Sequence, residues 1–211
     1  MKLFHFRDDH YGLKSLKERR LKIARIMELN DPFEFLGASL SDPNFRKAMN
    51  LTKQQLSEIT GILCFSKNWR NPVQWSHYAR EHKGICMAFE IPKRYLLKVD
   101  YVDKRIKFGT NINIETMKKF LTTKFSHWSY EEEYRLFISL DKNEEENGRY
   151  FSEFSEDLKL KQVIIGARSD ITRKQVSNAL GDLIQNVEVF KARPAFKTFR
   201  VVRNKNDKLW A

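Results

Sequence analysis

Short apolar runs of the kind that form buried strands recur along most of the chain. They lie at residues 2–6, 21–26, 62–66, 85–91, 97–102, 134–140, 163–165, 187–190 and 198–202. Between them, apolar residues spaced by three and four predict helices. These helices begin after Asp8 or Asp9, extend over 114–125, and run from Asp170 or Thr172 to Leu183. Because strands and helices alternate without a repeat or a linker, we expect one α+β (mixed α/β) domain over residues 1–211.

Two further segments carry residues that begin helices. In 30–34 (Asn-Asp-Pro-Phe-Glu), an Asp N-cap, a Pro at the first helical position and a Glu at the third form a capping box. This arrangement predicts a helix. Thr52 and Gln55 form a second such pair, which predicts a helix over 51–59 that Gly61 ends.

The composition is that of a globular chain with an excess of positive charge. Of 211 residues, 41% are hydrophobic and 31% charged, so the chain can bury one substantial core. Lys and Arg number 39 against 27 Asp and Glu, and the net charge of +12 attracts polyanions such as nucleic acid or a dinucleotide. Residues 1–7 are too short and too charged for a secretory signal, and no apolar run could span a bilayer. We therefore expect a cytoplasmic protein with no membrane partner.

Basic residues concentrate near the C-terminus. Residues 191–206 contain six Lys and Arg side chains and no acid, and we take Lys197, Arg200 and Arg203 as the candidate nucleic-acid contacts. A second basic cluster lies within 14–25. Because no recognised binding motif accompanies them, a solvated surface is the favoured interpretation, and a dedicated nucleic-acid groove is the alternative.

The two cysteines indicate no metal chemistry. Cys64 and Cys86 each lie in an apolar run, where a buried free thiol is the usual state. The chain contains no HExxH or CxxC motif and no glycine-rich loop that would cradle phosphate. We expect no metal site.

Candidate chemistry is densest in 128–135 (Trp-Ser-Tyr-Glu-Glu-Glu-Tyr-Arg). If 131–135 enters a strand, the period of two puts Glu131, Glu133 and Arg135 on one face. Two close carboxylates raise each other's pKa and an adjacent Arg lowers both, which can separate acid and base roles. The alternative is a helix end where Glu131 and Arg135 pair on the solvated surface, worth about 0.3–0.5 kcal/mol. The spacing favours neither alternative.

Aromatic and hydroxyl side chains make a second candidate site. A helix that begins at Asn71-Pro72 and closes at Gly84 carries on one face Trp75, Tyr78, Ala79 and His82. Together with Ser66 at the end of a strand, this face could line a pocket, although such stripes more often pack in the core. His5 lies between two phenylalanines and is expected to be a satisfied core or edge histidine.

The chain resembles the bacterial family known as domain of unknown function 2971 in six motifs, which occur in the order LFHFR, LNDPFEF, ILCFS, WSHYAREHKGICMAFE, WSYEEEYR and LKQVIIGAR. Members of that family show an NDP-aromatic-E box, a CFS strand, a W-S-x-Y-A helix and a W-x-x-E-x-E-aromatic-R box. The resemblance covers about residues 1 to 168.

That family is in turn similar to ADP-ribosyltransferases, which implies a split, mixed β-sheet core flanked by helices and an enzyme that cleaves NAD and modifies a nucleic-acid or protein acceptor. It also implies a toxin or phage-defence effector with a neutralising antitoxin protein as partner. The implied catalytic residues are Glu133, Glu131 and His5. The residues implied to bind NAD are His5, Ser66, Trp75, Tyr78 and Arg135.

Two other functions are open. The chain could be a non-catalytic nucleic-acid-binding module in which Glu133 and Arg135 are structural and the basic C-terminal segment binds; such binding would weaken steeply with salt and need no NAD. A metal-dependent nuclease is the third hypothesis, if the fold brings Glu131 and Glu133 to Asp31.

Overall fold

The structure of the chain, a computed structural model, describes residues 1–106, 113–143, 145–206, 208 and 210. It is mixed α/β, with a mixed β-sheet flanked by helices, which confirms this part of the prediction. The residues group into two compact units. Unit 1 comprises Met1–Leu21, Phe65–Arg94 and Ser152–Ala211, and unit 2 comprises Lys22–Cys64 and Tyr95–Phe151. The single domain expected from the sequence stays a prediction.

The sheet of unit 1 contains strands at or near the predicted apolar runs, but the strand predicted at 198–202 is wrong at residues 198–200, which form an exposed loop. The strands of this sheet are β1 (Lys2–Arg7), β4 (Ile85–Glu90), β10 (Lys159–Ile165), β11 (Glu188–Pro194) and β12 (Val201–Arg203), in the spatial order β12-β11-β10-β4-β1. β10 and β11 are parallel, and the other neighbours are antiparallel. Residues 85–89 of β4 are all buried, because a strand covered on both faces has no solvated side. This burial accounts for its uninterrupted apolar run.

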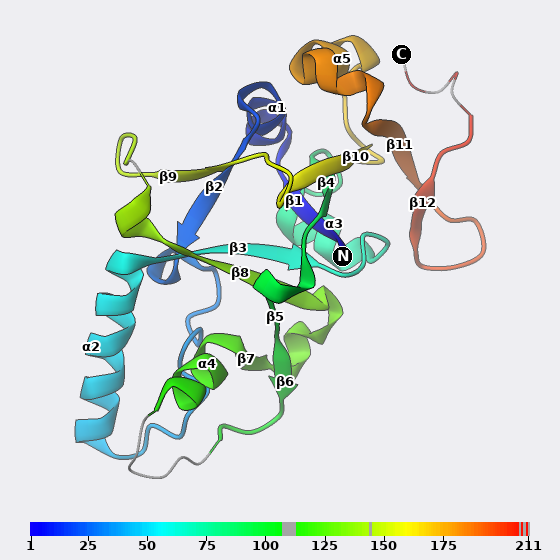
Figure 1. Ribbon diagram of the computed structural model, residues 1–211. Coiled ribbons are helices and arrows are strands. Elements are labelled where there is room, and N and C mark those ends of the chain that lie inside the picture. Colours follow the sequence, from blue (N-terminus) through cyan, green and yellow to red (C-terminus); the bar gives the residue numbers. More distant parts are fainter. Residues whose placement is uncertain (107–112, 144, 207, 209, 211) are drawn as a thin grey trace. The chain divides into compact units, whose positions relative to one another are not determined.

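The helices of unit 1 begin at capping residues. They are α1 (Asp9–Glu18), α3 (Pro72–Tyr78) and α5 (Arg173–Leu180), with short 3₁₀ turns at Lys93–Tyr95 and Gly181–Gln185. The carboxylate of Asp8 accepts a hydrogen bond from the Tyr11 amide at 2.8 Å. Thr172 and Gln175 form the capping box of α5. α1 and α5 pack side by side (Figure 1).

α3 ends one turn earlier than predicted. Its last residue is Tyr78, because Arg80, Glu81 and His82 have positive φ angles of 45°, 54° and 68° and cannot continue the helix. This turn still returns His82 to α3, where its ring stacks on that of Trp75 with centroids 6.2 Å apart. The predicted helical face is therefore wrong beyond Tyr78, although the contact between these two rings forms.

Unit 2 contains two sets of strands. The first set is β2 (Arg20–Arg25), β3 (Thr60–Ser66), β5 (Leu96–Lys98) and β8 (Glu133–Ser139), of which residues 20–21 of β2 and 65–66 of β3 belong to unit 1. β3 pairs with β2 and β8, and β8 pairs with β5. The second is the parallel pair β6 (Asp100–Val102) and β7 (Thr123–Phe125). The predicted strand 97–102 is thus divided at Val99, whose amide donates to the Glu133 carbonyl at 3.0 Å. β9 (Tyr150–Glu153) was not predicted.

The helices of unit 2 are α2 (Pro43–Ile59) and α4 (Ile114–Thr122), with short 3₁₀ turns at Ile26–Glu28, Ser126–Glu131 and Leu140–Lys142. α2 leads directly into β3 (Figure 1). The predicted start of α2 is wrong, because Asp42 caps the helix by accepting from the Phe45 amide at 2.7 Å. Thr52 lies inside the helix, and Gly61 lies within β3. A Cβ on Gly61 would be 2.1 Å from Cγ2 of Ile23, so close packing explains this glycine.

The predicted helix 114–125 is correct only as far as Thr122, after which β7 begins.

The helix predicted at 30–34 is also wrong, since these residues form a turn. Oδ1 of Asp31 accepts from the Phe33 amide at 2.9 Å, as an N-cap would, but Phe35 then takes a left-handed φ of 66°. The Glu34 carboxylate does not complete the capping box because it pairs with Arg135. A long-range ion pair therefore overrides the local helix signal.

Within the described residues, no helix combines the length and the hydrophobicity needed to cross a lipid bilayer.

Candidate functional site

The acidic segment reaches β8 through a turn rather than a continuous strand. Glu131 ends the 3₁₀ turn, Glu132 takes a left-handed φ of 46°, and β8 begins at Glu133. The strand alternative for 131–135 therefore fails at its first two residues, and Glu131 does not share the face of Glu133 and Arg135 in β8. Glu133 and Arg135 still share a face of β8, because side chains two residues apart in a strand point the same way.

The guanidinium of Arg135 is completely hydrogen-bonded. It donates to both oxygens of Glu133 at 2.8 and 3.0 Å and to both oxygens of Glu34 at 2.7 and 2.9 Å. A further hydrogen bond is donated to the Leu121 carbonyl at 2.8 Å. Only 1% of Arg135 is exposed, so these bonds replace those that water would make. The wet-surface pairing of Glu131 with Arg135 is thereby contradicted.

Lys124, from β7, lies among three carboxylates. Its Nζ donates to Oε2 of Glu131 at 2.7 Å and to Oε2 of Glu133 at 3.4 Å, and it lies 3.5 Å from Oε1 of Glu34. All these side chains are buried. We call the five residues Glu34, Lys124, Glu131, Glu133 and Arg135 the ion network.

The ion network argues against the metal-dependent nuclease hypothesis. Carboxylates do gather in unit 2, but the ammonium of Lys124 stands where a shared metal ion would have to lie. Asp31, the third ligand of that hypothesis, uses Oδ1 to accept from the Phe33 amide. Among the described residues, no three His, Cys, Asp or Glu side chains are arranged to hold a metal ion.

Charges in the ion network shift the pKa values of Glu133, Lys124 and the neighbouring Cys64. Burial alone would raise the pKa of Glu133, but the neighbouring charges of Arg135 and Lys124 lower it to about 2. Burial lowers the pKa of Lys124, and the nearby carboxylates reverse this effect and raise it above its ordinary value. Burial, followed by the charge of Glu133, raises the pKa of the Cys64 thiol. Glu133 is therefore an ionised carboxylate at neutral pH.

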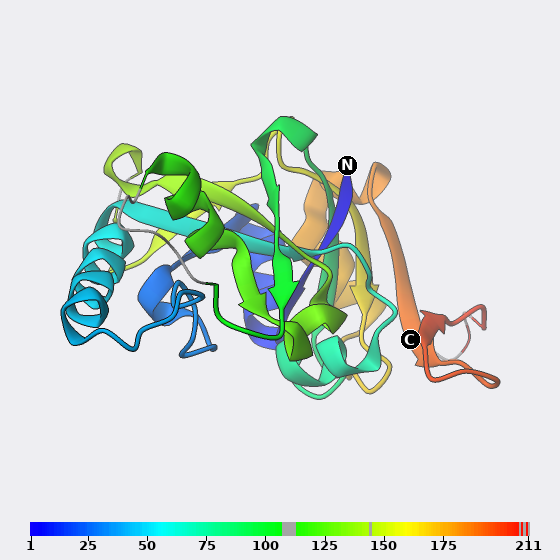
Figure 2. The same cartoon turned by 90° about the horizontal axis from the view of Figure 1, so that it is seen from below.

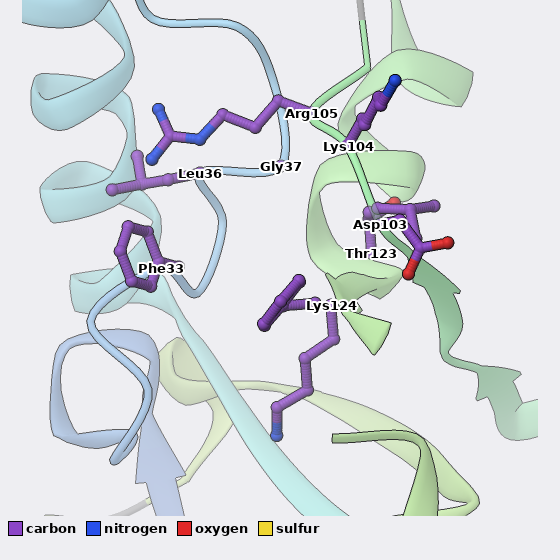
Figure 3. A pocket seen from close by; sticks show the side chains of 10 residues that line it. Phe33, Leu36, Gly37, Asp103, Lys104, Arg105, Thr123 and Lys124 are labelled. Atoms are coloured by element: carbon purple, nitrogen blue, oxygen red, sulfur yellow. The ribbon is translucent and has the colours of Figure 1, made fainter. Parts of the chain in front are cut away.

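A pocket of about 260 Å³ adjoins the ion network (Figure 3). It is lined by Phe33, Leu36, Gly37, Val102, Asp103, Lys104, Arg105, Thr123, Lys124 and Phe125. In Figure 3 the Arg105 side chain reaches toward Leu36 and Phe33, with its guanidinium carbon 5.4 Å from the centroid of the Phe33 ring. Lys124 extends away from Arg105, and it is the one member of the ion network in the lining.

The pocket combines aromatic surface with positive charge. Phe33 is 56% exposed, and Phe125 is also exposed. Lys104 and Arg105 are exposed, whereas Lys124 is buried with its charge balanced by the carboxylates of the ion network. Such a lining suits a ligand that has both a planar ring and a negative group.

His5 and Ser66, candidates from the sequence, lie in unit 1. His5 is half-buried in β1, opposite Met87, with its ring centroid 5.7 Å from that of Phe65. Ser66 is buried, and its hydroxyl donates to the Asn68 carbonyl at 2.9 Å and accepts from the Asn68 amide at 2.9 Å. It also accepts from Nε2 of Gln74 at 3.0 Å. The Ser66 hydroxyl thus organises the turn that leads into α3.

Trp75 is a core residue, as the more favoured interpretation of its helical spacing expects. It is completely buried, its indole N–H donates to the Trp69 carbonyl at 2.6 Å, and Phe6 packs edge-on at 5.3 Å. No exposed face is left on which a ligand could stack. Tyr78, at the end of α3, is half-buried. Because these residues belong to unit 1 and the ion network to unit 2, a site shared by both stays a prediction.

Sequence reasoning missed two members of the ion network. Glu34 was noted in the sequence, but only as the third helical residue of a predicted capping box. Lys124 follows a helix in a short Thr-Lys-Phe strand and carries no signal of its own. Both contact the acidic segment only because the fold brings separate parts of the chain together.

The basic C-terminal segment forms a hairpin. β11 and β12 pair antiparallel, and the Ala195 amide donates to the Arg200 carbonyl at 2.8 Å at the base of the loop. We call residues 188–203 the basic hairpin. Among the predicted nucleic-acid contacts, Lys197 and Arg200 lie exposed in the loop. Arg203 is exposed but pairs with Glu188 at 2.5 Å.

No protein-family model, curated protein or solved structure matches the chain. Its functional interpretation therefore depends on the residues described above.

Proposed function

We propose that the chain is an ADP-ribosyltransferase-like enzyme that cleaves NAD and transfers ADP-ribose to a nucleic-acid or protein acceptor. The observation that carries this proposal is Glu133, a buried carboxylate held ionised at the first position of β8 and linked through Lys124 to a pocket. The resemblance assigns the catalytic carboxylate to this same residue.

The reaction needs a fixed negative charge beside the ribose. The bond between C1′ of the ribose and the nicotinamide nitrogen breaks, nicotinamide leaves with the bonding electrons, and positive charge develops on the ribose. The acceptor then forms a bond to C1′ and loses a proton. A carboxylate that is already ionised and oriented stabilises such a charge, which is the largest contribution in many enzymes. Glu133 does not itself line the pocket, so the proposal requires the Lys124 ammonium, 3.4 Å from Oε2 of Glu133, to move aside when the ribose binds. Arg135 holds Glu133 through two hydrogen bonds and so fixes its orientation.

The pocket supports the proposal through its size and lining. At about 260 Å³ it is slightly smaller than the usual small-molecule site, so it suits one nucleoside half of NAD better than the whole dinucleotide. Phe33 offers a ring face for stacking, and Arg105, whose guanidinium lies over that ring, offers positive charge for the pyrophosphate. The lining also contains the carboxylate of Asp103, whereas the Lys104 ammonium points away from Phe33 (Figure 3). Glu131 helps to position Lys124 between the pocket and Glu133.

The remaining assignments belong to the same proposal. The resemblance to ADP-ribosyltransferases assigns His5 the role of holding a ribose hydroxyl and Tyr78 a role in NAD binding. Ser66 would act indirectly, through the turn that it organises before α3. A toxin or phage-defence role, with a neutralising protein partner, would follow from uncontrolled transfer to cellular nucleic acid or protein.

Nicotinamide release from NAD tests the proposal, with cell lysate, total RNA and DNA supplied as acceptors. We expect Glu133→Gln to lower the rate by about 100-fold or more, because the side chain would no longer carry charge in the transition state. Glu132→Gln is the matched control, since it makes the same chemical change on the exposed neighbour and should leave the rate unchanged. Release that persists in Glu133→Gln, or no release from the wild-type chain in any mixture, would contradict the proposal.

A second variant tests whether NAD binds in this pocket. Arg105→Ala removes an exposed pocket cation that lies outside the ion network, so the fold should be retained, as circular dichroism would show. We expect KM for NAD to rise about 10-fold with kcat little changed, because the guanidinium binds the substrate and the transition state alike. An unchanged KM would place the NAD outside this pocket.

A further inference from the structure

We propose that the basic hairpin is a binding surface for single-stranded nucleic acid, with Phe196 and Phe199 as stacking platforms for bases. This inference does not depend on NAD cleavage, because unit 1 residues alone carry it. The hairpin would bind a single strand in the same way whether the chain modifies that partner or only binds it.

Phe196 and Phe199 are far more exposed to solvent than is usual for an apolar side chain. Phe196 is 90% exposed and Phe199 is 99% exposed, although most Phe side chains in folded proteins are largely buried. They lie in the loop between β11 and β12, which extends away from the other strands of unit 1 in both views (Figures 1 and 2). Neighbouring exposed aromatic groups on one loop are typical of interaction sites.

Hydrogen bonds fix the ends of the loop, and a cation–π contact orients Phe196. The ends of the loop are joined by the Ala195 to Arg200 hydrogen bond, and the Val201 amide donates to the Arg70 carbonyl at 2.8 Å. The guanidinium of Arg193 lies over the Phe196 ring at 4.0 Å from its centroid. This cation–π contact orients the ring and leaves its other face for a ligand.

Positive charge predominates around the aromatic pair. A depression of about 440 Å³ lies beside Phe196 and is lined by Arg70, Arg193, Ala195, Phe196, Lys197, Thr198, Val202, Arg203 and Lys205. Five of these nine residues are basic and none is acidic. The neighbouring sequence 191–206 also contains no acid. Arg203 pairs with Glu188, so the other four basic side chains carry the charge that is available to a ligand. A phosphate backbone is the ligand that such charge complements.

Aromatic rings and basic side chains together select a single strand. Bases of a single strand are free to stack on a protein ring, whereas those of a duplex are stacked on each other. Stacking accepts any base, so the hairpin should bind with little sequence preference. The cations around the depression would follow the backbone while Phe196 and Phe199 contact successive bases.

Fluorescence anisotropy tests the inference with a labelled, mixed-sequence single-stranded RNA of about 15 nucleotides, its DNA counterpart, and the matching duplex. We expect the single strands to bind more tightly than the duplex. Phe196→Ala with Phe199→Ala should weaken single-strand binding about 10- to 100-fold, while the slope of log affinity against log salt stays the same. Leu51→Ala, an exposed apolar truncation on α2, is the matched control and should bind like the wild-type chain.

The charged residues give an independent measurement. Lys197→Gln with Arg200→Gln should reduce the salt slope by about 0.7 for each phosphate that these side chains neutralise. Lys47→Gln with Lys119→Gln, exposed in unit 2, should leave the slope unchanged. Equal affinity for duplex and single strand, or an aromatic double variant that binds the strands normally, would overturn the inference. So would binding to vesicles containing anionic phosphatidylserine but not to the single strands, because the hairpin would then be a membrane contact.

Discussion

The ion network of unit 2 and the basic hairpin of unit 1 place charge in opposite surroundings. In the ion network, three carboxylates meet two cations at 2.7–3.5 Å, and all five side chains are buried. In the hairpin segment 191–206, six basic residues occur without an acid, and most of them are exposed. A buried charge must find its partners within the chain, because an unpaired one is costly, whereas an exposed charge stays available to a ligand.

This difference predicts where a substitution acts. Changes in the ion network should affect the free energy of unfolding and, through Glu133, the proposed catalysis. Changes in the hairpin should affect binding and leave unfolding almost unaltered. An exposed hairpin residue that is essential for folding would contradict this division of roles. So would a member of the ion network that can be replaced without lowering the free energy of unfolding.

The largest effect on stability is expected from Arg135→Ala. This change leaves the carboxylates of Glu34 and Glu133 buried without their bidentate partner, and it should lower the free energy of unfolding by about 3–5 kcal/mol. Urea unfolding followed by circular dichroism measures this difference. Arg200→Ala, in the exposed loop, should change it by less than about 0.5 kcal/mol. Similar values for the two variants would show that the network's bonds contribute little.

A smaller effect is expected from pH. The pKa of Glu133 is lowered from 4.5 to about 2, so its contribution to stability is fully present above pH 4.5 and is lost as pH falls toward 2. The loss should be on the order of 3 kcal/mol, because a pKa difference of one between the folded and unfolded chain corresponds to about 1.4 kcal/mol.

Chemical unfolding of the wild-type chain and of Glu133→Gln across this pH range measures that contribution. The variant cannot lose a charge at this position, so the two stability curves should converge as the solution is acidified. Lys197→Gln should follow the wild-type curve at every pH, since its parent side chain is exposed. Parallel curves for wild type and Glu133→Gln would mean that Glu133 is not held ionised in the folded chain.

Local sequence predicted much of the fold but could not distinguish two Asp-Pro helix signals. An Asp-Pro pair begins α2 at Asp42 and Pro43, whereas the same pair at Asp31 and Pro32 begins only a turn. The difference lies in Glu34, which pairs with a residue 101 positions away. No local rule includes that contact. The helix predicted after Asp31 is therefore wrong, and the helix start at Asp42 was not predicted.

The candidate site was predictable to the same extent. The period of two in a strand placed Glu133 and Arg135 on one face, and the structure confirms that placement. Lys124 and Glu34 could not be assigned, because each joins the network from a different part of the sequence. The basic segment was evident from its charge, but the exposure of Phe196 and Phe199 was not, since apolar residues are expected to be buried.

The most direct test of the proposed enzyme is a crystal structure of the Glu133→Gln variant grown with a saturating concentration of NAD, because slow cleavage should leave the dinucleotide intact. We expect one nucleoside half of NAD in the pocket, against Phe33, with the pyrophosphate near Arg105. An empty pocket, or NAD bound to residues remote from Lys124 and position 133, would contradict the proposed function.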